Sequence, residues 1–124
     1  MLSLTSIALQ FTISIGLLNV WILRFNKKTP YRGGVATTMK EEFLQYGLPV
    51  WACYVVGFWK ILSAVLLVLG IWIPALILPS AILILFLMLA AVTMHLMIRD
   101  PLKKAMPAFL VLVMSGAVIV INNP

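Results

Sequence analysis

The chain has 124 residues, of which 64% are hydrophobic and 10% are charged. One small water-soluble core cannot bury that much apolar surface, whereas a lipid bilayer accepts it, so the composition predicts an integral membrane protein. The net charge of +6 does not indicate nucleic-acid binding, because eight of the nine Lys and Arg residues fall in two loops between hydrophobic windows. The single cysteine, Cys53, excludes an intramolecular disulfide and thiol-exchange enzymes, which need a cysteine pair.

Four hydrophobic windows approach the roughly 20 residues that a helix needs to cross a bilayer, at 2–23, 50–73, 76–98 and 105–121. The last window is the shortest, and Leu102 is an alternative start. The first has no basic residue before it and contains Gln10 and Asn19, so we interpret it as an uncleaved span rather than a signal peptide. The sequence predicts an all-α bundle of four transmembrane helices in one domain, 1–124.

The basic residues predict how the bundle lies in the membrane. The first and third loops must share one side of a four-helix bundle, and the turn after Trp72 carries no charge. Cytoplasmic loops are enriched in Lys and Arg, so both termini are predicted to be non-cytoplasmic, and the protein to lie in the cytoplasmic membrane. The predicted cytoplasmic basic residues are Arg24, Lys27, Lys28, Arg32, Lys40, Arg99, Lys103 and Lys104.

The first loop, about 24–48, is long for a bundle and contains a short amphipathic segment at 36–46. Thr37 or Thr38 is the expected N-cap, with Glu41 in the first turn. We expect this helix to lie at the cytoplasmic interface. Its apolar residues would dip into the headgroup region while the charged ones stay in water. The first group is Phe43, Leu44 and Tyr46, and the second is Lys40, Glu41 and Glu42.

Lys60 is the most informative single position, because it lies about ten residues into a span and so near the bilayer midplane. A cation at that depth costs roughly 2.5 to 3.5 kcal/mol, so it should face the bundle interior and find a partner. Cys53, Gly57 and Ala64 share its helical face. Two interpretations stay open: a site for an anionic or carbonyl group of a ligand, or a lysine that fixes packing.

His95 lies near the cytoplasmic end of the third window. A lone histidine excludes a bis-histidine haem site, and one cysteine with no carboxylate pair nearby makes a poor metal site, so no metal is predicted. One interpretation is a proton acceptor or hydrogen-bond donor that lines a cytoplasm-facing cavity. The favoured alternative is a half-exposed interfacial histidine bonded to a loop carbonyl.

The chain contains three acids, Glu41, Glu42 and Asp100. Asp100 lies between Arg99 and Pro101, a pattern typical of a helix-end turn, and we expect it to pair with loop cations. For the two glutamates we expect a solvated face, because either could reach inward only if the loop helix folds under the bundle.

Polar side chains in the first span, including Gln10 and Asn19, either bond to a neighbouring helix or line a cavity, and helix packing is the more common role. Three of the four tryptophans lie near span ends, but Trp59 lies deep beside Lys60, which hints at an internal pocket. The candidate ligand-binding residues are Lys60, His95, Trp59, Gln10 and Asn19.

Four short motifs resemble the DoxX-like family of small four-helix membrane proteins, from about Lys40 to the end of the fourth span. They are Gly57-Phe-Trp-Lys60, Leu66-Leu-Val-Leu-Gly70, His95 with Arg99-Asp100-Pro101, and Ala105-Met-Pro107-Ala108. The resemblance implies a four-helix bundle associated with oxidoreductase systems, including quinone-linked membrane subunits, and in some relatives an assembly role. Better-known members carry a glutamate in place of Lys60, so no site is carried over to that position.

Three functions compete. The first is a non-catalytic accessory or assembly subunit of a membrane complex, for which a redox complex and a homo-oligomer are both open. This role needs no catalytic set, and none is evident, so no enzymatic activity is expected of the chain alone. The second is binding of a quinone-like or other lipophilic molecule in the bundle, with Lys60 and His95 as polar contacts. The third, a proton-coupled transporter, ranks low because no span contains an acid.

Overall fold

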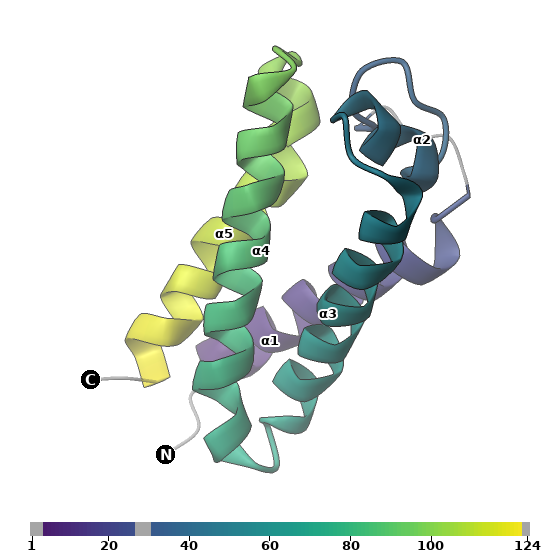
Figure 1. Ribbon diagram of the computed structural model, residues 1–124. Coiled ribbons are helices and arrows are strands. Elements are labelled where there is room, and N and C mark those ends of the chain that lie inside the picture. The colour runs from purple at the N-terminus through teal and green to yellow at the C-terminus, as the bar shows by residue number, and fades with distance from the viewer. Residues whose placement is uncertain (1–3, 27–30, 123–124) are drawn as a thin grey trace.

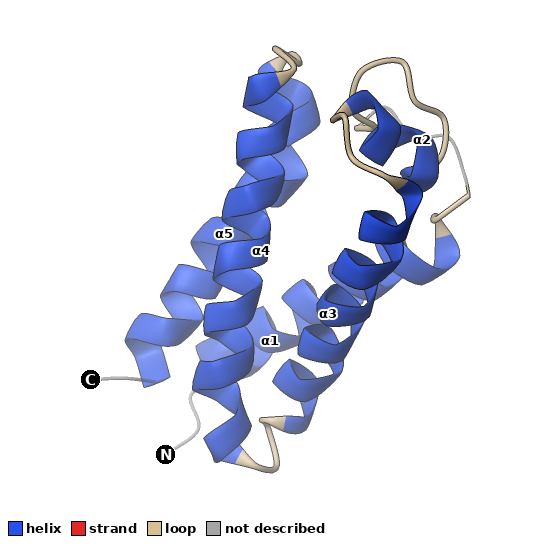
Figure 2. Ribbon diagram, viewed as in Figure 1, coloured by secondary structure: helices blue, strands red, loops and turns tan. Residues whose placement is uncertain are grey.

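The computed structural model describes residues 4–26 and 31–122, and these residues form helices and loops without a strand. Four helices are long and apolar enough to cross a membrane, so the predicted all-α membrane bundle is confirmed. Figures 1 and 2 show the long helices joined by one elaborate loop and two short turns. In chain order the elements are α1 (Leu4–Leu18), the π-helical turn η1 (Asn19–Leu23), α2 (Met39–Gln45), α3 (Val50–Leu69), the 3-10 turn η2 (Pro74–Leu76), α4 (Ile77–Met97) and α5 (Leu102–Asn122).

The four long helices close into a ring, because α1 and α4 each contact both α3 and α5. The Asn122 side-chain amide donates to the Ser6 hydroxyl over 2.9 Å, which places the start of α1 beside the end of α5. The α3–α4 turn lies at that same end in Figure 1, while α2 and the α4–α5 turn lie at the opposite end, called the loop end below. Which end faces the cytoplasm stays a prediction.

Two helix boundaries differ from the expected windows, for local reasons. The helix expected over 50–73 ends at Leu69, because the chain turns at Gly70, where a Cβ would approach Ile77 Cγ1 to 2.7 Å. The last helix begins at Leu102 rather than 105, directly after Pro101, which fits before the first helical turn. The expected start of the first span at Leu2 lies outside the described residues.

Hydrogen bonds between α1 and α3 join these two helices in the half of the bundle away from the loop end. The Gln10 side-chain amide donates to the Leu67 carbonyl over 2.9 Å and accepts from the Ser6 hydroxyl over 2.8 Å. The Ser14 hydroxyl donates to the Ala64 carbonyl over 2.9 Å. Small polar side chains of this kind let two helices approach closely in lipid. These bonds hold α1 against α3 in the half of the bundle away from the loop end.

Candidate functional site

A cavity of about 620 Å³ lies near the loop end of the bundle, within the size range of small-molecule sites. Residues of every long helix and of the first loop line it. Its apolar wall includes Leu17, Val20, Leu87, Met88, Ala91, Ala108 and Val111, and its polar wall Asn19, Arg24, Arg32, Glu42, Tyr46, Lys60, His95 and Lys104. The fold thus brings Lys60, His95 and Asn19, from three different spans, to one cavity.

Lys60 faces this cavity from α3. The residue is 8% exposed, and Cys53, Gly57 and Ala64 are buried on the same helical face. Its Nζ lies 4.7 Å from the centroid of the Trp21 ring, a cation–π contact. The predicted inward orientation of Lys60 is therefore confirmed, and its neighbour is an aromatic face.

Trp21 reaches Lys60 because α3 carries a glycine at position 57. A Cβ at Gly57 would lie 2.8 Å from two carbons of the Trp21 ring, closer than atoms pack. The π-helical turn η1 carries Trp21, and its widened hydrogen bond runs from the Arg24 N–H to the Asn19 carbonyl over 2.9 Å. Such single π turns recur at functional sites. Gly57 and η1 together hold the indole against α3.

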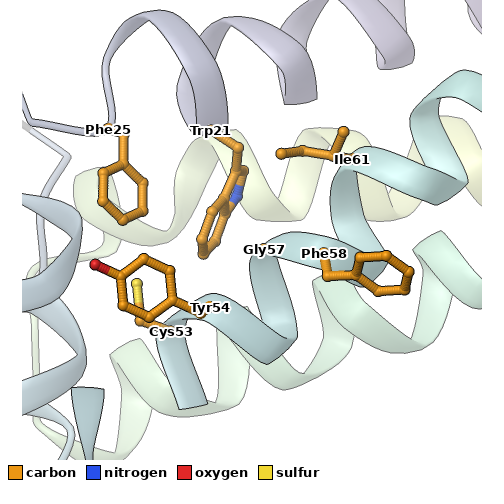
Figure 3. A pocket seen from close by; sticks show the side chains of 7 residues that line it. All are labelled: Trp21, Phe25, Cys53, Tyr54, Gly57, Phe58 and Ile61. Carbon is orange, nitrogen blue, oxygen red and sulfur yellow. The ribbon is translucent and has the colours of Figure 1, made fainter. Parts of the chain in front are cut away.

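A second, open groove of about 250 Å³ lies on the other side of Trp21 (Figure 3). In that view Trp21 and Phe25 project from one chain segment toward Cys53, Tyr54 and Gly57 of α3. Trp21 lines both the groove and the cavity.

His95 lies in a polar network at the loop end. Its Nδ1 lies 2.7 Å from Asp100 Oδ2, and its Nε2 lies 3.2 Å from the Tyr46 hydroxyl. The residue is 6% exposed, so the expectation of a half-exposed histidine bonded to a loop carbonyl is wrong. It also has two carboxylates near it, since Glu42 Oε1 lies 3.8 Å from Nε2.

The turn after α4 explains how Asp100 reaches His95. Arg99 adopts a left-handed conformation with φ of 57°, and the Asp100 N–H donates to the His95 carbonyl over 3.0 Å. This is the usual way to end a helix, here with arginine in place of glycine. The Gly34 N–H donates to the other carboxylate oxygen over 3.0 Å, and Lys104 Nζ lies 3.9 Å from it. The predicted pairing of Asp100 with a loop cation is confirmed.

Glu42 is 7% exposed, so the expected solvated face is wrong for this residue, whereas Glu41 is exposed as predicted. Glu42 accepts from the Gly33 N–H over 2.7 Å and lies 3.8 Å from the Arg32 guanidinium. The loop before α2 folds back over the bundle and supplies these partners. The stripe Met39, Glu42, Phe43 and Tyr46, at spacings of three and four, was the sequence signal for this buried face.

The other residues of α2 divide as follows. Phe43, expected in the headgroup region, is buried and packs edge-on against Trp21 with ring centroids 6.0 Å apart. Leu44 is exposed. Burial raises the pKa of the Tyr46 phenol above its ordinary value, and the Glu42 carboxylate raises it further, so Tyr46 stays a neutral hydroxyl.

Arg32 is buried, although sequence reasoning gave it only a role in orientation. Its guanidinium donates to the carbonyls of Arg24 and Phe25 and contacts the sulfur of Met39. Burial lowers the pKa of Arg32 while the Glu42 carboxylate opposes that shift, and an arginine stays charged in either case. Lys27 and Lys28 lie outside the described residues.

Two further candidates lie away from the cavity. Trp59 is 44% exposed and packs edge-on against Phe58, with ring centroids 5.4 Å apart. Gln10 is buried in the contact between α1 and α3. Among residues 4–26 and 31–122, no group of three or more His, Cys, Asp or Glu side chains is placed to hold a metal ion.

Four apolar helices around a partly charged cavity define a small multi-pass membrane protein. The sequence model of the DoxX-like family matches residues 33–120, which is more than half of the chain. The chain therefore belongs to the DoxX-like family. Neither the curated proteins nor the solved structures compared with it gave a match.

Proposed function

We propose that this protein binds a lipophilic small molecule with an oxygen-bearing head group, such as a quinone, in the cavity near the loop end. The observation that carries the proposal is a hollow of about 620 Å³ that Lys60 lines from the middle of the apolar helix α3. A charged side chain within a membrane span is costly, and residues of this kind commonly mark a ligand or ion site. A ligand oxygen that accepts a hydrogen bond from Lys60 would offset part of this cost.

The walls of the cavity suit an amphiphilic molecule. Leucine, methionine, valine and alanine side chains of α4 and α5 form a broad apolar surface for the body of the ligand. Nearer the loop end the wall is polar, but both ring nitrogens of His95 are already bonded, one of them to the Tyr46 hydroxyl, which leaves Lys60 as the main polar contact for a head group. Binding sites of this kind combine a largely apolar lining with a few placed polar groups.

A second role, as an accessory or assembly subunit of a membrane complex, is compatible with ligand binding and with an association with redox enzymes. Its support is the resemblance to family members with such roles. In this proposal the protein lies in the cytoplasmic membrane with its basic loops inside, as the charge bias favours.

The test is native mass spectrometry of the protein extracted in mild detergent. Ala91 lines the cavity, so Ala91→Phe fills part of it while leaving the charged residues in place. Val113 is an exposed residue of α5, so Val113→Phe adds the same ring on the lipid-facing surface as a matched control. We expect a small lipophilic molecule to co-purify with the wild type and with Val113→Phe, and to be lost from Ala91→Phe.

Equal retention of that molecule by all three proteins would show that it binds outside the cavity and would overturn the proposal. A stoichiometric protein partner with no bound small molecule would favour the accessory-subunit role instead.

A further inference from the structure

We propose that the ligand of this cavity is a lipophilic monoanion, of the long-chain carboxylate class, whose negative oxygen pairs with Lys60. The proposal rests on the proposed function, because it assumes that the cavity is a ligand site. It goes beyond that function by assigning the charge of the ligand and the atom that recognises it.

The first step is that none of the acids forms a direct ion pair with Lys60. Its three acids are all described, and each is occupied elsewhere. Glu41 is exposed and bonds to Thr37 and Thr38. Glu42 pairs with Arg32, and Asp100 pairs with His95 and Lys104. No described carboxylate lies within 4.0 Å of Lys60 Nζ. Glu42, the one acid in the cavity wall, acts on Lys60 only over a longer distance and is already paired with Arg32, so an anionic ligand would be the first direct counter-ion of Lys60.

The second step is the charge of the cavity wall as a whole. Four Lys or Arg side chains line it against one acid, Glu42. The whole chain has the same bias, with nine basic residues and three acids, so the positive excess of the cavity wall agrees with the composition of the protein. An anion that enters this cavity therefore meets a complementary field.

The third step is depth. Lys60 lies ten residues beyond the start of α3 at the loop end, about 15 Å along the helix axis at 1.5 Å per residue. It is nearly excluded from solvent and rests on the apolar face of Trp21. Attraction between opposite charges is much stronger there than in water. A neutral head group would accept one hydrogen bond but would leave the ammonium without a direct counter-ion.

The experiment compares dodecanoate with dodecanol, which share the alkyl chain and differ in head-group charge, by equilibrium binding to the purified protein in mild detergent at about pH 8, where the carboxylic acid is ionised. The variants are Lys60→Met, Lys60→Arg and Lys103→Met. Lys103 is an exposed cation that does not line the cavity, so its replacement removes the same charge elsewhere. Circular dichroism and gel filtration first establish that each variant is folded.

We expect the wild type to bind dodecanoate at least about tenfold more tightly than dodecanol, since a tenfold ratio corresponds to only about 1.4 kcal/mol. Lys60→Met should abolish this preference, and Lys60→Arg and Lys103→Met should retain it. If Lys60→Met does not fold, Lys60→Gln replaces it. We then expect Lys60→Gln to lose the preference for dodecanoate and Lys60→Arg to keep it.

Equal affinity for the two probes in the wild type would overturn the anion proposal. If that shared binding is lost in Ala91→Phe, the cavity is still a ligand site and only the charge assignment fails. If neither probe responds to Ala91→Phe, the proposed function fails as well. A preference for dodecanoate that survives in folded Lys60→Met would place the anion at another cation and would also overturn the assignment.

Discussion

Lys60 and His95 are both buried ionisable side chains on one cavity wall, but their neighbours differ. His95 bonds to Asp100 and to Tyr46. The Asp100 carboxylate also accepts from the Gly34 N–H and lies near the Lys104 ammonium. Lys60 has the Trp21 ring as its charge-stabilising neighbour. His95 is fully bonded, whereas Lys60 faces a cavity. Loss of the Lys60 charge should therefore stabilise the protein, and disruption of the hydrogen bonds around His95 should destabilise it.

Lys60→Met should leave the protein folded and raise its free energy of unfolding by about 1 to 3 kcal/mol, because a buried charge is replaced by an apolar side chain of similar length. Thermal denaturation in mild detergent measures the change, with Lys103→Met as the control for loss of a surface charge. Loss of folding in Lys60→Met would show that the protein needs Lys60 to fold, and would contradict this prediction.

Asp100→Asn should lower the free energy of unfolding by about 1.5 to 3 kcal/mol, the usual worth of hydrogen bonds to a charged group. The substitution removes the carboxylate that joins His95 to the Gly34 N–H and to Lys104. Glu41→Gln makes the same chemical change at an exposed acid. Equal denaturation midpoints for the two variants would contradict the assigned role of Asp100.

At the scale of elements, the hydrophobic windows located the four long helices, because length and apolar content are read directly from the sequence. The fold of the first loop could not be read in the same way. Its buried residues depend on contacts such as that between Gly34 and Asp100, which are 66 positions apart. The inward stripe of α2 was visible, but its meaning depended on a loop that folds over the bundle.

Gly57→Ala tests how α3 and the first span fit together. The added methyl group would meet the Trp21 ring at 2.8 Å, so the indole must move away from α3 and from Lys60. We expect a loss of about 1 to 3 kcal/mol in stability, as in other overpacked cores, with a shift in tryptophan fluorescence. Gly116 has open space at its Cβ position, so Gly116→Ala is the matched control. Identical spectra and midpoints would show that Trp21 does not pack as described.

Two side chains cap the N-terminus of α2. Thr38 Oγ1 accepts from the Glu41 N–H over 3.3 Å, and the Glu41 carboxylate accepts from Thr37. Thr38→Ala should destabilise α2 by about 1 kcal/mol, seen as faster amide exchange at residues 39–45. Unchanged exchange there, relative to a Val113→Phe control, would contradict the cap.

The same cap predicts a pH dependence. Hydrogen bonds from the Thr37 hydroxyl and N–H lower the pKa of Glu41. Because the folded pKa lies below the unfolded value of about 4.3, ionised Glu41 stabilises the cap above that pH. The contribution is lost as the pH falls through the folded pKa. Exchange at α2 should therefore rise in acid in the wild type and less so in Glu41→Gln.

For the whole molecule, the charge bias predicts that the loop end faces the cytoplasm. In a Cys53→Ala background, Trp72→Cys places a thiol in the exposed α3–α4 turn, and Lys103→Cys places one at the loop end. A membrane-impermeant maleimide added to intact cells should label the first variant, and the second only after permeabilisation. The reverse pattern would contradict the predicted orientation.

The cavity itself was beyond sequence reasoning. Lys60 and His95 were each marked by an unusual residue type in a span, but their meeting in one hollow depends on how α3 and α4 separate toward the loop end. Adjacency in the chain suggests that Trp59 and Lys60 share a pocket. Successive helical residues point in different directions, however, and Trp59 faces outward.

The central claim is that this cavity holds a small molecule, and an experimental structure of the protein in a native-lipid nanodisc tests it most directly. The account predicts elongated non-protein density in the cavity, with its polar end beside Lys60 Nζ and the Trp21 ring, and with its apolar body along α4 and α5. A cavity that contains only water, or that neighbouring side chains close, would contradict it.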